Sequence, residues 1–221
     1  MNERRWMAPL LGIVFIVVVI VGFAVGGEPP DIDEGAAEAV EFYTDNEDEV
    51  IAGSLLQGIA AVLFVFFAGV LRSRLREAED SRGTLSAIAF GGALIFAAGL
   101  AIDATINVAA SEAVDEGVDP ITIHTLAALW QNDWVPFAVG LLTFMIATGF
   151  SIVRFGLLPK WLGWVAIALA IIAATPVAGV GFIGTGVFII VISVLLARRE
   201  RAGAGPATTA PPPPPAAPPA V

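Results

Sequence analysis

Long apolar runs without charge alternate along this chain with short segments that carry most of its charged residues. A helix needs about 20 apolar residues to cross a hydrocarbon core about 30 Å thick. Four runs have this length, and they cover residues 7–26, 51–71, 85–106 and 135–153. Only Asp103 places a charge inside them. The pattern therefore predicts at least four membrane-spanning helices.

A fifth uncharged run covers residues 161–197. As a single helix it would measure about 55 Å, which is too long for one crossing. Residues that favour turns lie near its middle, at Thr175-Pro176, Gly179, Gly181, Gly184 and Gly186. We therefore predict two helices, 161–178 and 180–197, joined by a turn that these residues form. The total is six crossings.

The basic residues test this count, because short loops rich in Lys and Arg stay on the cytoplasmic side of a membrane. They form four patches, which are Arg4 and Arg5; Arg72, Arg74, Arg76 and Arg82; Arg154 and Lys160; and Arg198, Arg199 and Arg201. Six crossings place all four patches on the cytoplasmic side, whereas five crossings would move the last patch outside. The predicted fold is an all-α polytopic membrane helix bundle with six transmembrane helices and both termini cytoplasmic.

Composition agrees with a membrane protein. The chain has 57% hydrophobic and 14% charged residues, whereas soluble domains carry about 25% charged residues. We expect one bundle over residues 1–200, because the segments outside the apolar runs are too short for a second core. A disordered Pro/Ala-rich cytoplasmic tail is predicted for residues 201–221. The lack of cysteine excludes disulfides and thiolate catalysis.

A cleaved signal peptide is the alternative for the first helix, since Arg4 and Arg5 precede an apolar run. That run is longer than the roughly 7–15 residues typical of a signal peptide. An uncleaved helix is therefore favoured, and mass spectrometry of the mature N-terminus distinguishes the two.

Sixteen of the 21 acidic residues fall on or near the predicted outer side, mostly in the loops 27–50 and 107–134. Helical spacing in the first loop predicts a helix with one acidic face. The residues with this spacing are Glu34, Glu38, Glu41 and Asp45. Asn46 and Glu49 resemble a capping pair at the start of the second membrane helix.

The acidic residues around Asp31 and Asp33 lack the ligand spacing of an EF-hand calcium loop. We therefore expect the outer loops to attract cations diffusely and predict no metal site there.

The second outer loop contains an Asp-Pro pair at residues 119–120, which is a typical helix start and predicts a short helix over residues 121–130. Asn132 or Asp133 then caps the fourth membrane helix. His124, the only histidine, lies on the short helix, where a surface or packing role is the simplest interpretation.

Polar groups inside membrane helices are the usual indicators of function. Asp103 and Asn107 lie four residues apart near the outer end of the third helix, and Gln57 lies in the outer half of the second. One interpretation is that Asp103 is a partly solvated charge at a helix end. The alternative hypothesis is a polar pocket that opens outward, built from Gln57, Asp103 and Asn107 and covered by His124 or Asp133.

Residues 179–184 match the G-x-G-x-x-G pattern of dinucleotide-binding proteins. That fingerprint needs a preceding strand, and none is predicted here. We interpret these glycines as residues of the turn and of close helix packing. No hydrolase, zinc-protease or nucleotide signature occurs, so no catalytic, cofactor-binding or metal-binding residues are predicted.

The segment FGLLPKWLGW at residues 155–164 predicts an inner turn in which Pro159 starts a helix and two tryptophans anchor the interface. Together with LRSRLREAED at residues 71–80, this segment resembles a group of small, uncharacterised six-helix membrane proteins common in high-GC actinobacteria. The resemblance covers about residues 7–197 and implies the same six-helix fold. It carries no known catalytic residues and transfers no site.

Two classes of function remain. We expect a noncatalytic integral protein of the cell membrane, which stabilises or regulates a complex through a homo-oligomer or a membrane protein partner. The alternative is a small transporter or channel-like protein for cations or a basic solute. Neither an enzyme activity nor a cofactor is expected. The expected partner is the lipid bilayer, and no binding of nucleic acid is expected.

Overall fold

The computed structural model describes residues 5–79, 83–175 and 178–203. Within these ranges it contains helices and no strand, which confirms the all-α class. The elements are η1 (Arg5–Leu10), α1 (Leu11–Gly26), α2 (Ala36–Asp45), α3 (Glu47–Ala78), α4 (Thr84–Asp115), α5 (Pro120–Gln131), α6 (Trp134–Phe155), α7 (Lys160–Ala173) and α8 (Ala178–Gly203). The predicted tail lies outside the described residues from residue 204 onward.

Five helical segments are long and apolar enough to cross a membrane, and they are Trp6–Gly26, Glu47–Ala78, Thr84–Asp115, Pro120–Phe155 and Gly179–Ala202. The chain therefore has the helices of a multi-pass membrane protein. The helix predicted over residues 161–178 is shorter than expected, because α7 has 14 residues and ends at Ala173. Such a helix measures about 21 Å, less than a bilayer core of about 30 Å. Thr175 closes this end by donating its hydroxyl to the Ile172 carbonyl at 2.6 Å.

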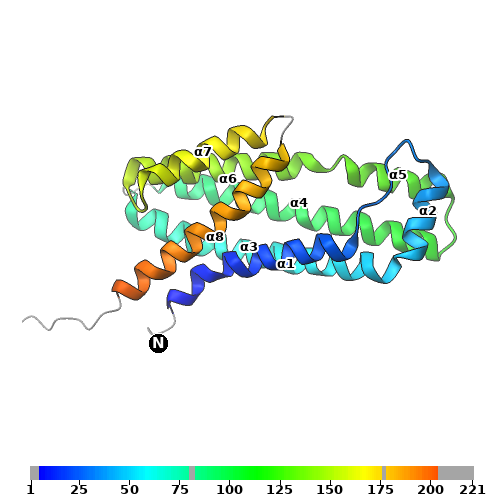
Figure 1. Cartoon of the computed structure of the whole chain (residues 1–221), viewed down its shortest axis with the longest axis horizontal. Coiled ribbons are helices and arrows are strands. Elements are labelled where there is room, and N and C mark those ends of the chain that lie inside the picture. Colours follow the sequence, from blue (N-terminus) through cyan, green and yellow to red (C-terminus); the bar gives the residue numbers. More distant parts are fainter. Residues whose placement is uncertain (1–4, 80–82, 176–177, 204–221) are drawn as a thin grey trace, which may run out of the picture.

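Figure 1 shows that the chain connections separate into two ends of the bundle. The start of η1, the α3–α4 and α6–α7 connections and the end of α8 lie at the left end, which we call the basic end. Its basic residues include Arg72, Arg74, Arg76, Arg154, Lys160, Arg198, Arg199 and Arg201. Helices α2 and α5 lie at the opposite end, which we call the acidic end. The chain also reverses between α7 and α8, part of the way along the bundle.

Glycines allow the long helices to approach until their backbones touch. A Cβ atom on Gly92 of α4 would collide with the Phe144 nitrogen of α6 and would lie 2.8 Å from the Gly140 carbonyl oxygen. A Cβ atom on Gly53 of α3 would lie 2.5 Å from the Gly26 Cα of α1. Small residues at these positions are typical of helix contacts in membranes, where close packing replaces the hydrophobic effect.

The glycines after Thr175 do not form the α7–α8 turn, so that part of the prediction is wrong. Helix α8 begins at Ala178 and contains Gly179, Gly181 and Gly184. A Cβ atom on Gly181 would lie 2.5 Å from the Ala173 nitrogen, and one on Gly184 would collide with the Leu169 side chain. The predicted role in close helix packing is therefore confirmed.

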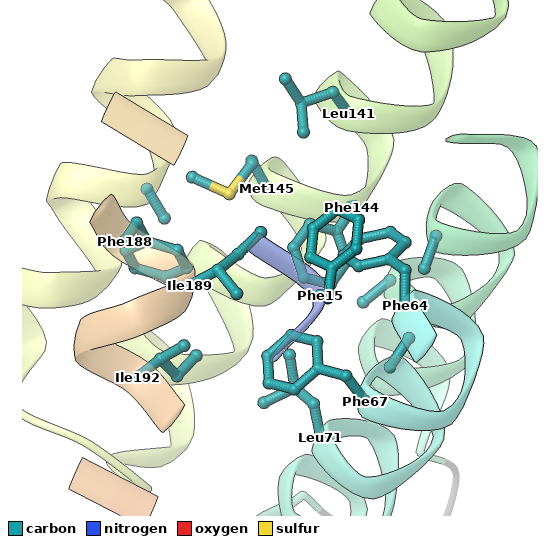
Figure 2. Close-up of a cluster of buried hydrophobic side chains, with 14 of the residues drawn as sticks. Phe15, Phe64, Phe67, Leu71, Leu141, Phe144, Met145, Phe188, Ile189 and Ile192 are labelled. Atoms are coloured by element: carbon teal, nitrogen blue, oxygen red, sulfur yellow. The ribbon is translucent and has the colours of Figure 1, made fainter. Parts of the chain in front are cut away.

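Aromatic rings fill the middle of the bundle (Figure 2). Phe64 of α3 is fully buried, and its ring centroid lies 4.6 Å from that of Phe15 in α1 and 5.5 Å from that of Phe144 in α6. Phe188 and Ile189 of α8 close the other side of this core. Tilted and edge-on aromatic pairs of this kind add stabilisation beyond the burial of their area.

A second, smaller core lies at the acidic end, contrary to the expectation of a single one. It contains Ala39, Tyr43, Val50, Ala110, Ile123 and Ala127. Helices α2 and α5 are too short to form it alone. The core forms because α3 and α4 extend beyond the apolar runs. Helix α3 adds Val50 from its first turn, and α4 adds Ala110 from its last turns.

The helices α3 and α5 begin close to the predicted residues, but the predicted capping hydrogen bonds are not formed. Helix α5 begins at Pro120, as the Asp-Pro pair predicts. Asn46 precedes α3, but its amide donates to the Phe42 carbonyl at 2.8 Å and does not cap α3. The acidic residues of the first α3 turn still complement the partial positive charge at the start of that helix.

Candidate functional site

Buried and half-buried polar side chains from several helices meet beneath the acidic end. We call this group the outer polar cluster, and it consists of Tyr43, Gln57, Asp103, Asn107, Trp130 and Asp133. The Asp103 carboxylate lies beside the Gln57 amide and the Trp130 indole, within electrostatic reach of Asp133. Asp103 precedes the end of α4 by 12 residues, or about 18 Å of helix. The cluster is therefore covered by the second core and does not lie at the tip of the molecule.

The hypothesis of a polar group around Asp103 predicts part of this arrangement. Gln57 and Asp103 are each 3% exposed, and Asn107 is 7% exposed. The interpretation of Asp103 as a partly solvated helix-end charge does not agree with this burial. A buried ionisable residue in a membrane helix is a candidate functional group.

Tyr43 is a member of the cluster that sequence reasoning missed. Its hydroxyl donates a hydrogen bond to Asn107 Oδ1 at 3.1 Å, which joins α2 to α4. Burial raises the pKa of the Tyr43 phenol, so the hydroxyl keeps its proton and remains a donor. The available signal was the spacing of Ala39 and Tyr43, which form an apolar stripe beside the acidic residues of α2.

His124 is placed differently from the prediction that it covers the pocket. Its Nε2 atom bonds to the Ile32 carbonyl at 2.9 Å, and Gln131 donates to the Pro30 carbonyl at 2.6 Å. These two contacts hold the loop before α2 against α5. Trp130 takes the place beside Asp103.

Unpartnered polar atoms concentrate in this part of the molecule. Eight buried side-chain polar atoms lack a hydrogen-bond partner among the described residues, and six of them lie in the cluster or one helical turn from it. The six are Ser54 Oγ, Gln57 Oε1, Asp103 Oδ2, Ser111 Oγ, Trp130 Nε1 and Asp133 Oδ2. Each unsatisfied buried group costs about 1–3 kcal/mol, and more when it is charged. The Trp130 indole and the Asp103 carboxylate are close enough to interact, and ordered water or a bound ligand can satisfy the remaining groups.

The chemistry of the cluster favours a positively charged ligand. Among the six unpartnered groups, the two carboxylates and the Gln57 carbonyl oxygen are acceptors. The Trp130 indole is a donor, and the two hydroxyls can donate or accept. Within the described ranges, no three His, Asp or Glu side chains are placed to hold a metal ion together. A site here would combine carboxylate, amide and hydroxyl oxygens.

A groove of about 530 Å³ lies between α3 and α4, and its lining includes residues next to cluster members in the sequence but no cluster member itself. It is lined by Ser54, whose hydroxyl is unpartnered, and by Ala104, the neighbour of Asp103. Glu112 lines it as well.

Tyr43→Phe is expected to lower the free energy of unfolding by about 1–3 kcal/mol, because Asn107 would keep a buried acceptor without its donor. Faster hydrogen exchange of the α2 amides would report the loosened contact with α4. Thr44→Ala is the matched control, since Thr44 is exposed and bonds only within α2. Equal effects of the two changes would contradict a role of the Tyr43–Asn107 bond in holding α2.

The chain was compared with protein families, curated proteins and solved structures. No curated protein and no solved structure matches the chain. The family model described as domain of unknown function (DUF4386) matches residues 7–201, a range that contains the outer polar cluster. The chain therefore belongs to the DUF4386 family.

Proposed function

We propose that this protein is a noncatalytic integral membrane protein whose outer polar cluster binds a small cation or the ammonium group of a basic solute. The observation that carries the proposal is the buried Asp103 carboxylate, whose Oδ2 atom lacks a partner beside the equally unpartnered Gln57 Oε1. A bound cation would satisfy both oxygens and offset the cost of burying the charge.

The electrostatics of the acidic end support this ligand class. Helix α2 and the first turn of α3 contribute Glu38, Glu41, Asp45, Glu47, Asp48 and Glu49. The described basic residues lie at the other end of the bundle. A surface of one sign raises the local concentration of counter-ions, so the acidic end delivers cations to the region of the cluster.

The packed core favours binding over passage through the bundle. Phe64 contacts the rings of Phe15, Phe67, Phe96 and Phe144, with centroid distances between 4.6 and 6.2 Å. These rings lie between the outer polar cluster and the basic end. A cation that crosses would have to lose its water and displace this core, which is unfavourable. We therefore favour a binding or regulatory protein over a transporter.

The proposal includes a location in the cell membrane with the basic end in the cytoplasm, following the positive-inside rule. It also counts α7 as a sixth crossing. The reversal between α7 and α8 returns Arg198 to the end that holds Arg154. A short apolar helix can cross where the bilayer thins locally or where packed neighbours cover it, at modest cost.

The test combines ligand-dependent stability with flux. Thermal unfolding of the protein in nanodiscs would be followed with Na⁺, K⁺, Mg²⁺, Ca²⁺ and methylammonium, with the bulky cation N-methyl-D-glucamine as reference. At least one small cation should stabilise saturably, by about 2.7 kcal/mol at a hundredfold excess over its Kd. The same cation should show no flux into proteoliposomes above that of protein-free vesicles. Measurable flux would favour the transporter, and no stabilisation by any cation would overturn the proposal.

A further inference from the structure

A second polar pocket lies at the opposite, basic end of the bundle. It has a volume of about 430 Å³ and is lined by Gly69, Arg72, Ser73, Arg76 and Glu77, all from α3. These residues include the end of the apolar run in α3, which stops at Leu71. In a membrane, this is the depth at which hydrocarbon gives way to headgroups.

Two guanidinium groups dominate the charge of this pocket. Arg72 and Arg76 are four residues apart and therefore lie on the same face of α3. Neither makes an ion pair with another described residue. Glu77, the acidic lining residue, is already engaged by Arg74 at 3.0 Å. Among the described residues, no carboxylate is paired with either of these two positive side chains.

The surroundings hold one of these side chains in place and leave room below it. The Arg72 guanidinium lies over the Phe90 ring of α4, 5.3 Å from its centroid. Gly69 lies about one turn deeper, where a Cβ atom would still be 4.0 Å from Phe90. The missing side chain leaves open space beside the Phe90 ring at the deeper side of the pocket, and we call this space the slot.

We propose that this pocket binds the headgroup of an anionic phospholipid. The forked guanidinium donors of Arg72 and Arg76 match the oxygens of a phosphate group, and the Ser73 hydroxyl adds a further donor. An acyl chain of the same lipid follows the slot over Gly69 and Phe90. Basic pockets at the cytoplasmic boundary of membrane helices are suited to such lipids. This site is independent of the cation bound at the acidic end.

The test measures the thermal stability of the detergent-purified protein as lipids are added. Phosphatidylglycerol and cardiolipin should raise the unfolding temperature saturably, whereas phosphatidylcholine and soluble glycerol 1-phosphate should not. The double variant Arg72→Gln, Arg76→Gln should need about tenfold more phosphatidylglycerol for the same shift, because the paired phosphate contacts are lost. Arg154→Gln, Lys160→Gln is the matched control, with the same loss of charge at the same end but outside the pocket. Its lipid dependence should stay within about twofold of wild type.

Equal losses in the two double variants would overturn the proposal, since diffuse attraction to the basic end would then explain the binding. An equal shift with glycerol 1-phosphate would replace the lipid by a free phosphate ligand. If the glutamine variant fails to fold, Arg72→Lys, Arg76→Lys retains the charge without the forked donors. That variant should still lose affinity for phosphatidylglycerol, and wild-type affinity would contradict the assigned geometry.

Discussion

Gly92→Ala is expected to lower the free energy of unfolding by about 1–3 kcal/mol or more, because the added methyl group cannot fit between α4 and α6. Its Cβ atom would meet the backbone nitrogen of Phe144 and the carbonyl oxygen of Gly140. Backbone atoms of a packed helix cannot move aside as a flexible side chain does. The two helices would have to separate, and circular dichroism during thermal unfolding in detergent would measure the loss.

Gly91→Ala provides the control for this substitution. A Cβ atom at Gly91 meets nothing within 4 Å. Both substitutions replace glycine by alanine within a helix, which favours the folded helix by about 1 kcal/mol in each case. Gly91→Ala should therefore be at least as stable as wild type. If the two variants unfold at the same temperature, the close contact between α4 and α6 is not as described.

Asp103→Asn is expected to have opposite effects on stability and on ligand binding. In N-methyl-D-glucamine buffer the variant should be more stable than wild type by about 1–3 kcal/mol, since it removes a buried charge that lacks a full set of partners. The stabilisation by small cations should disappear, because the neutral amide does not attract them. Thermal unfolding in both buffers measures the two effects together.

Asp115→Asn is the matched control for Asp103. Asp115 lies on the same helix, and its replacement removes the same charge, but its side chain is exposed. Its replacement should change the stability by less than about 0.5 kcal/mol and should leave the cation response intact. A loss of the response in both variants would assign it to the general acidity of this end. A loss of stability in Asp103→Asn without added cations would indicate that the carboxylate supports the fold.

The apolar runs predicted the positions of the membrane helices because the bilayer imposes a length and an apolar composition on each of them. The same physics explains the difference at α7. The uncharged run from residue 161 to 197 shows that the chain must turn, but no charge marks where it does. Helix α8 includes Gly181 because a helix satisfies its own backbone hydrogen bonds in lipid, whereas a longer turn would not.

Contacts between helices were harder to predict, and the outer polar cluster illustrates the reason. Gln57, Asp103 and Asn107 were found because a polar residue is conspicuous in an apolar helix. Tyr43 and Trp130 were missed, since nothing local shows that α2 and α5 fold over α4. Tyr43 and its partner Asn107 are 64 residues apart in the sequence. Only the packing of the second core brings them together.

The most direct test of cation binding at the outer polar cluster uses Trp130, whose indole lies beside Asp103. A protein that keeps this tryptophan and carries Phe in place of the others, Trp6, Trp134, Trp161 and Trp164, would be titrated with Na⁺, K⁺, Mg²⁺, Ca²⁺ and methylammonium in nanodiscs. We predict a saturable change in Trp130 fluorescence with at least one of these cations, and no change when Asp103→Asn is added. An unchanged spectrum with every cation, or the same response in both proteins, would contradict cation binding at Asp103.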